Sequence, residues 1–83
     1  MKIHERHGYV IKHSVYGLYL DKSMKQHTAS LFGAITFRSE AEANFMLNDS
    51  LYYRPDHPED YKIVPTIEKR MEKGDEDDVQ QVG

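Results

Sequence analysis

Apolar and polar residues alternate near the start of the chain, and this pattern predicts two strands. The segment 8–13 ("GYVIKH") alternates as a half-buried strand does, with side chains on two sides: Tyr9, Ile11 and His13 against Val10 and Lys12. The segment 14–20 ("SVYGLYL") is rich in Val, Tyr and Leu, which predicts a second strand. The two strands either form a tight hairpin at His13-Ser14 or are one long strand that bends at Gly17.

Two later apolar segments complete the predicted sheet. Residues 21–30 ("DKSMKQHTAS") form a polar loop by composition, and the nearly continuous apolar run 31–37 ("LFGAITF") favours a central strand covered on at least one face. The segment 61–68 ("YKIVPTIE") predicts a last strand that turns three side chains to the core: Tyr61, Ile63 and Ile67. Because Pro65 has no N–H to donate, this strand should lie at an edge of the sheet or contain a bulge.

A helix start is the best-marked boundary in the chain. Ser39 is typical of an N-cap whose hydroxyl accepts a hydrogen bond from the amide of Glu42, while Glu42 reaches back to the Ser39 amide. The helix should run over residues 40–53 ("EAEANFMLNDSLYY"), and Arg54-Pro55 sets its limit, since the residue before a proline avoids the helical region. It should lie across the sheet through an apolar stripe and the residues that widen it: Ala41, Phe45 and Tyr52, then Ala43, Met46 and Leu47.

This order of elements, β-β-β-α-β, predicts an α+β fold in which one helix packs on one face of a small antiparallel sheet. The 83 residues are enough for one domain, which we expect at residues 1–71. Residues 72–83 carry five acids and few apolar side chains, and we expect them to form a disordered acidic tail. The chain has no cysteine, which excludes disulfides and thiolate zinc sites.

Charge is distributed unevenly along the chain. The net charge is -3, but residues 1–38 carry +4, residues 39–71 carry -3 and residues 72–83 carry -4. A basic face could meet an acidic partner, with the tail as competitor or spacer; the alternative is an ordinary mixed surface with a solubilising tail. No apolar run approaches the roughly 18 residues of a membrane span, and no signal peptide is visible. We therefore expect a cytoplasmic protein with no membrane partner.

The sequence "HERH" at residues 4–7 suggests a zinc site, but its spacing disfavours one. A zincin helix needs two histidines four residues apart, whereas His4 and His7 are three apart. If the segment is extended instead, residues three apart point to opposite faces. The loop 54–61 ("RPDHPEDY") gathers carboxylates around His57 but offers no nucleophile, no phosphate cradle and no regular ligand spacing. We predict no catalytic residues, no metal ligands and no cofactor.

Tyrosines among basic residues predict a binding surface. The chain has six tyrosines and three phenylalanines but no tryptophan. Aromatic side chains on a basic sheet can stack single-stranded nucleic acid, and the same combination serves protein interfaces. Tyr52, Tyr53 and Arg54 could form a second anchor at the helix end, or the tyrosines could close the edge of the core. The predicted binding residues are Lys12, Tyr16, Tyr19, Lys22, Lys25, Tyr53 and Arg54.

Three segments resemble a pattern in small uncharacterised proteins of phages and bacteria: "GLYL", "ITFRSEAEANFML" and "DYKIVPTIE". In those proteins a β-hairpin precedes an F-x-S-x-x-E-A helix start, and a Y-x-I-V-P strand closes the domain. The resemblance covers roughly residues 9–68 and matches at Phe37, Ser39, Glu42, Ala43, Tyr61, Ile63, Val64 and Pro65. The longer loop at 21–30 departs from it. The resemblance implies a fold and a mobile-element origin but no activity.

We therefore expect a non-enzymatic interaction protein, a phage or prophage accessory factor that binds a host protein and inhibits it by occlusion. The alternative is a nucleic-acid-binding module that uses a basic, tyrosine-bearing sheet face and loses affinity steeply with salt. An exposed sheet edge would also allow a homodimer by strand pairing.

Overall fold

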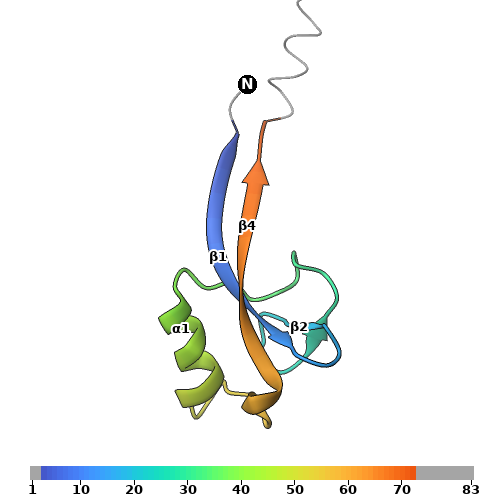
Figure 1. Ribbon diagram of the computed structural model, residues 1–83, viewed down its shortest axis with the longest axis vertical. Helices are drawn as coiled ribbons and strands as arrows, with labels where there is room; N and C mark the ends of the chain where they lie inside the picture. The colour runs from blue at the N-terminus through green and yellow to red at the C-terminus, as the bar shows by residue number, and fades with distance from the viewer. Residues whose placement is uncertain (1–2, 73–83) are drawn as a thin grey trace, which may run out of the picture.

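The computed structural model describes residues 3–72. Four strands form one antiparallel sheet in the order β3-β2-β1-β4, with one helical segment beside it (Figure 1). The strands are β1 (His4–His13), β2 (Tyr19–Leu20), β3 (His27–Thr28) and β4 (Tyr61–Arg70). The helical segment comprises α1 (Glu40–Asn44) and the π-helical η1 (Phe45–Asp49), and a 3-10 turn, η2 (Pro58–Asp60), precedes β4. The predicted α+β class and order of elements are confirmed.

The longest pairing of the sheet joins β1 to β4 along the full length of both strands. On its other edge, β1 bonds at Tyr9, whose N–H and C=O both pair with Phe37, and at His13, whose N–H donates to the Leu18 carbonyl. Successive residues of a strand direct their backbone groups to opposite edges. The backbone N–H and C=O groups of the odd-numbered residues of β1 therefore point away from β4, and those of the even-numbered residues bond to β4.

Pro65 lies on an edge strand, as predicted, because β4 is the last strand of the sheet. It stands opposite Tyr9, so its backbone belongs to the odd-numbered set that faces away from β1. The missing N–H therefore falls on the outer edge of the sheet, where it removes no ladder bond. No bulge is needed, and the register continues unbroken through this position.

The first strand is longer and the second much shorter than their patterns predicted. β1 begins at His4 rather than at Gly8, so "HERH" is part of the strand. Residues 14–18 form a turn instead of strand: the Gly17 amide bonds to the His13 carbonyl at 3.0 Å, and Gly17 takes a positive φ of 71°. The His13 ring stabilises this turn, since its Nδ1 accepts hydrogen bonds from the Val15 and Tyr16 amides. A local side-chain bond therefore overrode the β propensity of these residues.

The third strand was predicted in the wrong place. β3 lies inside the polar stretch 21–30, where a loop closed by a bond from the Asp21 amide to the Gln26 carbonyl returns the chain alongside β2. The apolar run 31–37 is not a strand, and only Ala34 and Phe37 form isolated bridges, to Asp21 and Tyr9. This run, which we call the crossing segment, passes from β2 across β1 to the helix (Figure 1). Its apolar residues lie where the segment crosses β1 and do not form a ladder of hydrogen bonds with another strand.

The predicted N-cap is confirmed in part. Ser39 is extended, and its hydroxyl accepts the Glu42 amide at 3.1 Å. Glu42 reaches back one residue further than predicted, to the amide of Arg38 at 3.4 Å. Both contacts satisfy amides near the helix start, and Glu40 and Glu42 stand at the positive end of the helix dipole.

The helix ends at Asp49, earlier than the predicted limit at Arg54-Pro55. Ser50 is extended, its hydroxyl accepts the Tyr53 amide, and its carbonyl accepts the Arg54 amide. The side-chain bond of Ser50 offers the backbone an alternative to continued helix, and Asn and Asp just before Ser50 favour that outcome. The buried face holds Ala43 and Leu47, with Met46 half-buried. The predicted stripe is wrong, because its members are exposed: Ala41, Phe45 and Tyr52.

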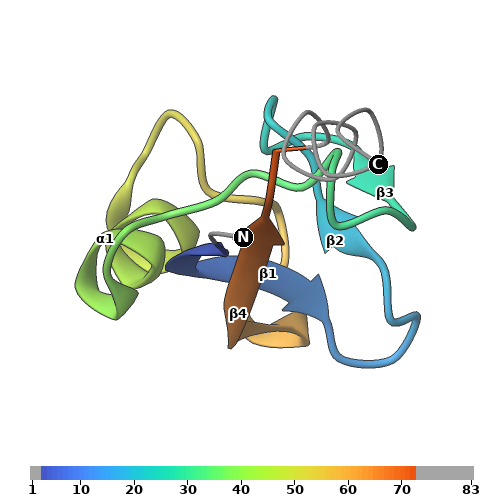
Figure 2. The ribbon, with the colours of Figure 1, turned by 90° about the horizontal axis from the view of Figure 1, so that it is seen from above.

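The core lies between β1, the helix and the β2–β3 loop. It comprises Ile11, Leu20, Met24, Phe37, Ala43 and Leu47, with Tyr61 and Ile63 packed against it as predicted. Ile67, which was also predicted to face the core, is half exposed. Val10, on the opposite side of β1 from Ile11, is buried too, at 1% exposure. Figure 2 shows α1 and the β2–β3 hairpin on opposite flanks of the β1–β4 pair.

The proposed tail 72–83 lies, from residue 73 on, outside the described residues.

Candidate functional site

A groove of about 660 Å³ lies between the β1–β4 pair and the crossing segment. Its apolar part is formed by Val10, Ala34 and Ile35, and Leu31, Phe32 and Ile67 add exposed apolar surface. Its basic part is formed by Arg6, Lys22, Lys69 and Arg70. We call this feature the basic groove.

Gly8 allows the crossing segment to pass directly over β1. A Cβ atom at this position would lie 2.8 Å from Thr36 Cγ2, closer than real Cβ atoms come, and a tight 3.1 Å from the carbonyl oxygen of Phe37. The lack of a side chain therefore brings Thr36 and Phe37 against the strand. The crossing segment becomes a wall of the groove, and Val10 is buried beneath it.

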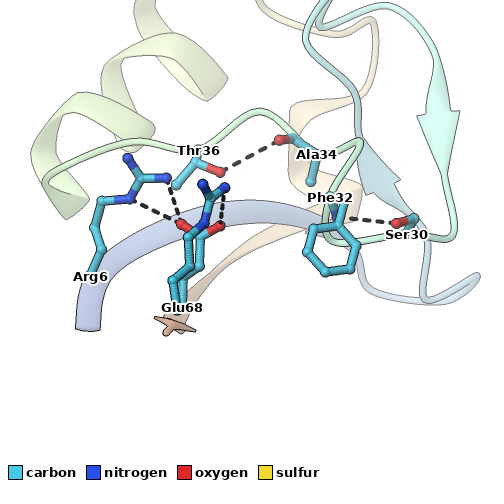
Figure 3. Close-up of polar contacts among 7 residues, drawn as sticks. Arg6, Ser30, Phe32, Ala34, Thr36 and Glu68 are labelled. Atoms are coloured by element: carbon cyan, nitrogen blue, oxygen red, sulfur yellow. Dashed lines mark hydrogen bonds and ion pairs between the residues drawn. The ribbon is translucent and has the colours of Figure 1, made fainter. Parts of the chain in front are cut away.

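Phe32 stands at the tip of a tight turn. Its amide donates to Ser30 Oγ at 3.1 Å, and the Gly33 amide donates to the Ser30 carbonyl at 3.1 Å. Gly33 packs close to Thr28, where a Cβ would lie 3.0 Å from Oγ1. The turn leaves the Phe32 side chain 87% exposed (Figure 3). A large aromatic side chain so exposed beside a groove is typical of a binding anchor.

The charges of the groove are partly paired. Arg6 donates to Glu68 Oε1 through Nε at 3.1 Å, and Arg70 donates to Glu68 Oε2 at 3.3 Å (Figure 3 labels Arg6 and Glu68). The hydrogen bond from Arg6 holds the pKa of the Glu68 carboxyl below its ordinary value; burial opposes this, and the charges of Arg6 and Arg70 reinforce it. Among residues 3–72, four cationic side chains and one carboxylate line the groove, so these residues give it an excess of three positive charges.

A smaller pocket of about 260 Å³ lies at the other end of β1 and shares no lining residue with the basic groove. His13 stacks on Tyr16 with ring centroids 4.5 Å apart and meets Tyr61 edge-on at 5.0 Å. His27 Nε2 lies 2.7 Å from the Tyr61 hydroxyl. We call this feature the histidine pocket.

The chemistry of the histidine pocket is constrained by its hydrogen bonds. His13 Nδ1 accepts two backbone amides, so its neutral ring carries its hydrogen on Nε2. Burial, followed by the charges of Asp60 and Asp56, raises the pKa of the Tyr61 hydroxyl. Tyr61 therefore stays protonated at neutral pH and acts as a hydrogen-bonding partner of His27 rather than as a nucleophile.

"HERH" does not assemble a metal site in the part of the chain that the structure describes. His4 and His7 are three apart on an extended strand, and both are exposed. Within residues 3–72, no group of three or more His, Asp or Glu side chains is placed to hold a metal ion. The nearest partner of His7 is Glu5, with Nε2 and Oε2 3.9 Å apart.

The structure distributes the seven predicted binding residues over four places. Lys12 and Tyr19 are cross-strand partners with the ammonium 5.7 Å from the ring centroid, and Lys22 lines the basic groove. Tyr16 and Lys25 line the histidine pocket. Tyr53 and Arg54 lie in the turn after the helix, where Tyr53 contacts Tyr52 with centroids 4.6 Å apart. The seven residues therefore do not form one continuous surface.

Sequence reasoning missed most of the basic groove. Arg6, Phe32 and Arg70 were not predicted as binding residues. A signal for Phe32 was present, since Ser30 and Gly33 flank it as turn residues do. The arginines gave no such signal, because the pairing of β1 with β4 brings together residues more than sixty positions apart.

No family model matches this chain, and neither a curated protein nor a solved structure was found that matches it. The resemblance to phage and bacterial proteins therefore stays a prediction. In residues 3–72, no helix has the length and apolar character to cross a membrane.

Proposed function

We propose that the protein is a non-enzymatic binding protein whose basic groove holds an acidic and partly apolar segment of a partner protein. One observation carries the proposal: Phe32, 87% exposed, stands beside a groove with an excess of three positive charges. An aromatic anchor next to an apolar floor favours burial of a partner's apolar side chain. The surrounding cations favour a partner whose remaining side chains are acidic.

The groove supports binding better than it supports catalysis. Its carboxylate, Glu68, is held between two guanidinium groups, which stabilise its charge and weaken it as a base. The hydroxyls that line it are those of Thr36 and Thr66, and no base is bonded to either of them among the described residues. A nucleophile needs an adjacent base to be activated. We therefore propose a binding role without chemistry.

A protein partner fits these contacts better than a nucleic acid does. Single-stranded nucleic acid needs several aromatic faces along a basic track. Here the exposed Tyr16 and the Lys12–Tyr19 pair lie outside the groove, and Phe32 is the one Phe or Tyr side chain that lines it within residues 3–72. Nucleic-acid binding remains the second hypothesis, and its signature is a steep loss of affinity with salt.

We further propose that the protein is a phage or prophage accessory factor. Such a protein would inhibit a host protein by covering an acidic surface, with the groove as the point of attachment. The mechanism requires contact area and charge complementarity alone, which suits a chain of 83 residues.

A peptide-binding experiment tests the groove directly. The probe is a labelled eight-residue peptide of alternating Asp and Leu, titrated with the full chain and followed by fluorescence anisotropy. We expect Phe32→Ala to weaken binding about tenfold, as loss of an aromatic anchor does. Phe45→Ala is the matched control, since Phe45 is also exposed but lies on the helix, and it should leave binding unchanged.

Two further arms separate the hypotheses. Lys22→Gln, inside the groove, should weaken binding more than Lys62→Gln, which removes an exposed charge from β4 outside it. An alternating Lys and Leu peptide should not bind. Failure of the acidic peptide to bind, or equal effects of the Phe32 and Phe45 variants, would show that the groove is not the site. Tight binding of a single-stranded oligonucleotide that weakens steeply with salt would favour the second hypothesis.

A further inference from the structure

One edge of β1 is left open between its start and Tyr9. Between the start of β1 and Tyr9, the backbone N–H and C=O groups that point away from β4 belong to Glu5 and His7. Within residues 3–72 no strand lies along this stretch, because β2 pairs with β1 at Lys12 and the crossing segment bridges it at Tyr9. The N–H and C=O groups of Glu5 and His7 therefore form a free pairing edge.

Within residues 3–72, the same part of the molecule is a ribbon of two strands with no third strand and no helix packed on it. In Figure 1, the first half of β1 and the second half of β4 extend together away from the helix and the hairpin. Residues 4–7 of β1 are exposed, and Ile67 on β4 is half exposed. An isolated two-stranded ribbon is only marginally stable in water, so additional strands would stabilise it.

We propose that a second copy of this chain pairs with this edge, antiparallel, about a two-fold axis at Arg6. In this register Glu5 of each copy stands opposite His7 of the other, and each such pair exchanges both backbone hydrogen bonds. The arrangement places β1 beside β1 and creates a continuous sheet with the order β4-β1-β1-β4. The contact is isologous, as closed two-fold dimers require.

The sequence of "HERH" favours this register over its neighbours. A carboxylate opposite an imidazole is favourable, and Glu5 already approaches His7 within one chain, at 3.9 Å. An axis at Glu5 would place the two Glu5 carboxylates opposite each other, which is destabilising. An axis at His7 would require the Tyr9 edge, which Phe37 occupies. Of the registers that match the free backbone groups, the one centred on Arg6 therefore remains.

The charge at the axis is balanced within each chain. The two Arg6 side chains would stand opposite each other, but each is bonded to Glu68 on its own β4. The competing edge, on the outside of β4, is less suited to pairing. Pro65 interrupts its row of donors, as in natural edges that avoid association. This inference concerns the strand edge and does not depend on what the basic groove binds.

Sedimentation of the full chain over a wide concentration range tests the dimer. The contact is short, so we expect weak association that becomes visible between about 10 µM and about 1 mM. Glu5→Pro removes a donor from the free edge and leaves the even-numbered bonds to β4 intact, so it should abolish association. Lys69→Pro is the matched control, because Lys69 points to the outer edge of β4, and it should associate normally.

A charge exchange tests the register. Glu5→His alone and His7→Glu alone place like side chains opposite each other and should weaken association. The double variant restores a complementary pair and should recover it. Hydrogen exchange of the Glu5 and His7 amides should slow as concentration rises, while other exposed amides stay unchanged. A chain that remains monomeric at about 1 mM, or a dimer lost in Lys69→Pro but kept in Glu5→Pro, would overturn the proposal.

Discussion

The two halves of β1 belong to the same strand but stand in opposite environments. In the second half, Val10 and Ile11 point to opposite faces, and both are buried, at 1% and 0% exposure. In the first half, residues 4–7 are exposed, and no strand among residues 3–72 pairs with the edge that faces away from β4. The boundary lies at Gly8 and Tyr9, where the crossing segment passes over the strand. Both halves of β1 bond to β4 in the same way. The segments that pack against each half therefore decide whether it belongs to the core or to the surface.

The largest effect that separates the two halves should come from truncating a core side chain. Ile11→Ala should lower the free energy of unfolding by about 3 kcal/mol, because it leaves a cavity among fully packed neighbours. Ile67→Ala, in the ribbon, should lower it by less than about 1 kcal/mol, since that side chain is half exposed. Urea unfolding measures both. If Ile11→Ala does not fold, Ile11→Val supplies the comparison at about 1 kcal/mol.

An intermediate effect should appear at the boundary. Gly8→Ala forces Thr36 and Phe37 away from β1, and overpacking of this kind costs about 1–3 kcal/mol. Thr36→Ser removes the methyl group that the new Cβ would strike, so the double variant should regain part of the lost stability. Equal unfolding free energies for Gly8→Ala and the wild type would mean that the crossing segment does not press on the strand.

The smallest effect should come from the ion pairs of the ribbon. The pKa of Glu68 is lowered in the folded state, so its contribution to stability is present above the unfolded pKa of about 4.3. This contribution is lost as the pH falls through the lower folded value. Glu68→Gln should therefore slightly lower the thermal unfolding temperature near pH 7, and this difference from the wild type should vanish as the pH falls below about 4.3. An unaltered acid limb in the variant would show that the arginines do not stabilise the carboxylate.

The parts of the fold that could be predicted depend on neighbouring residues. The alternation of residues 8–13 identified β1, the serine before the helix identified its cap, and Pro65 identified an edge strand. Each of these signals acts over a few positions, so a local pattern contains it. The helix end at Ser50 was also a local event, but the more conspicuous proline at residue 55 obscured it.

Two errors, the misplaced third strand and the missed groove, arose where distant contacts decide the outcome. The run 31–37 has a strand's composition, but it forms only isolated bridges, from Ala34 to Asp21 and from Phe37 to Tyr9, so it crosses instead of forming a ladder. Its misassignment concealed Phe32, the anchor proposed for the basic groove. Of the predicted binding residues, Lys22 alone lines that groove. Arg6 and Arg70, which were not predicted, reach the groove only because β1 and β4, from opposite ends of the chain, pair with each other.

That pairing also sets the order in which the protein can acquire its structure. β1 contains Ile11 at the centre of the core, yet its long partner strand, β4, is the last to be synthesised. Contacts between residues so far apart in sequence form slowly, because a long loop must close first. The edge of β1 that bonds to β4 therefore stays unpaired until residues 61–70 have been synthesised.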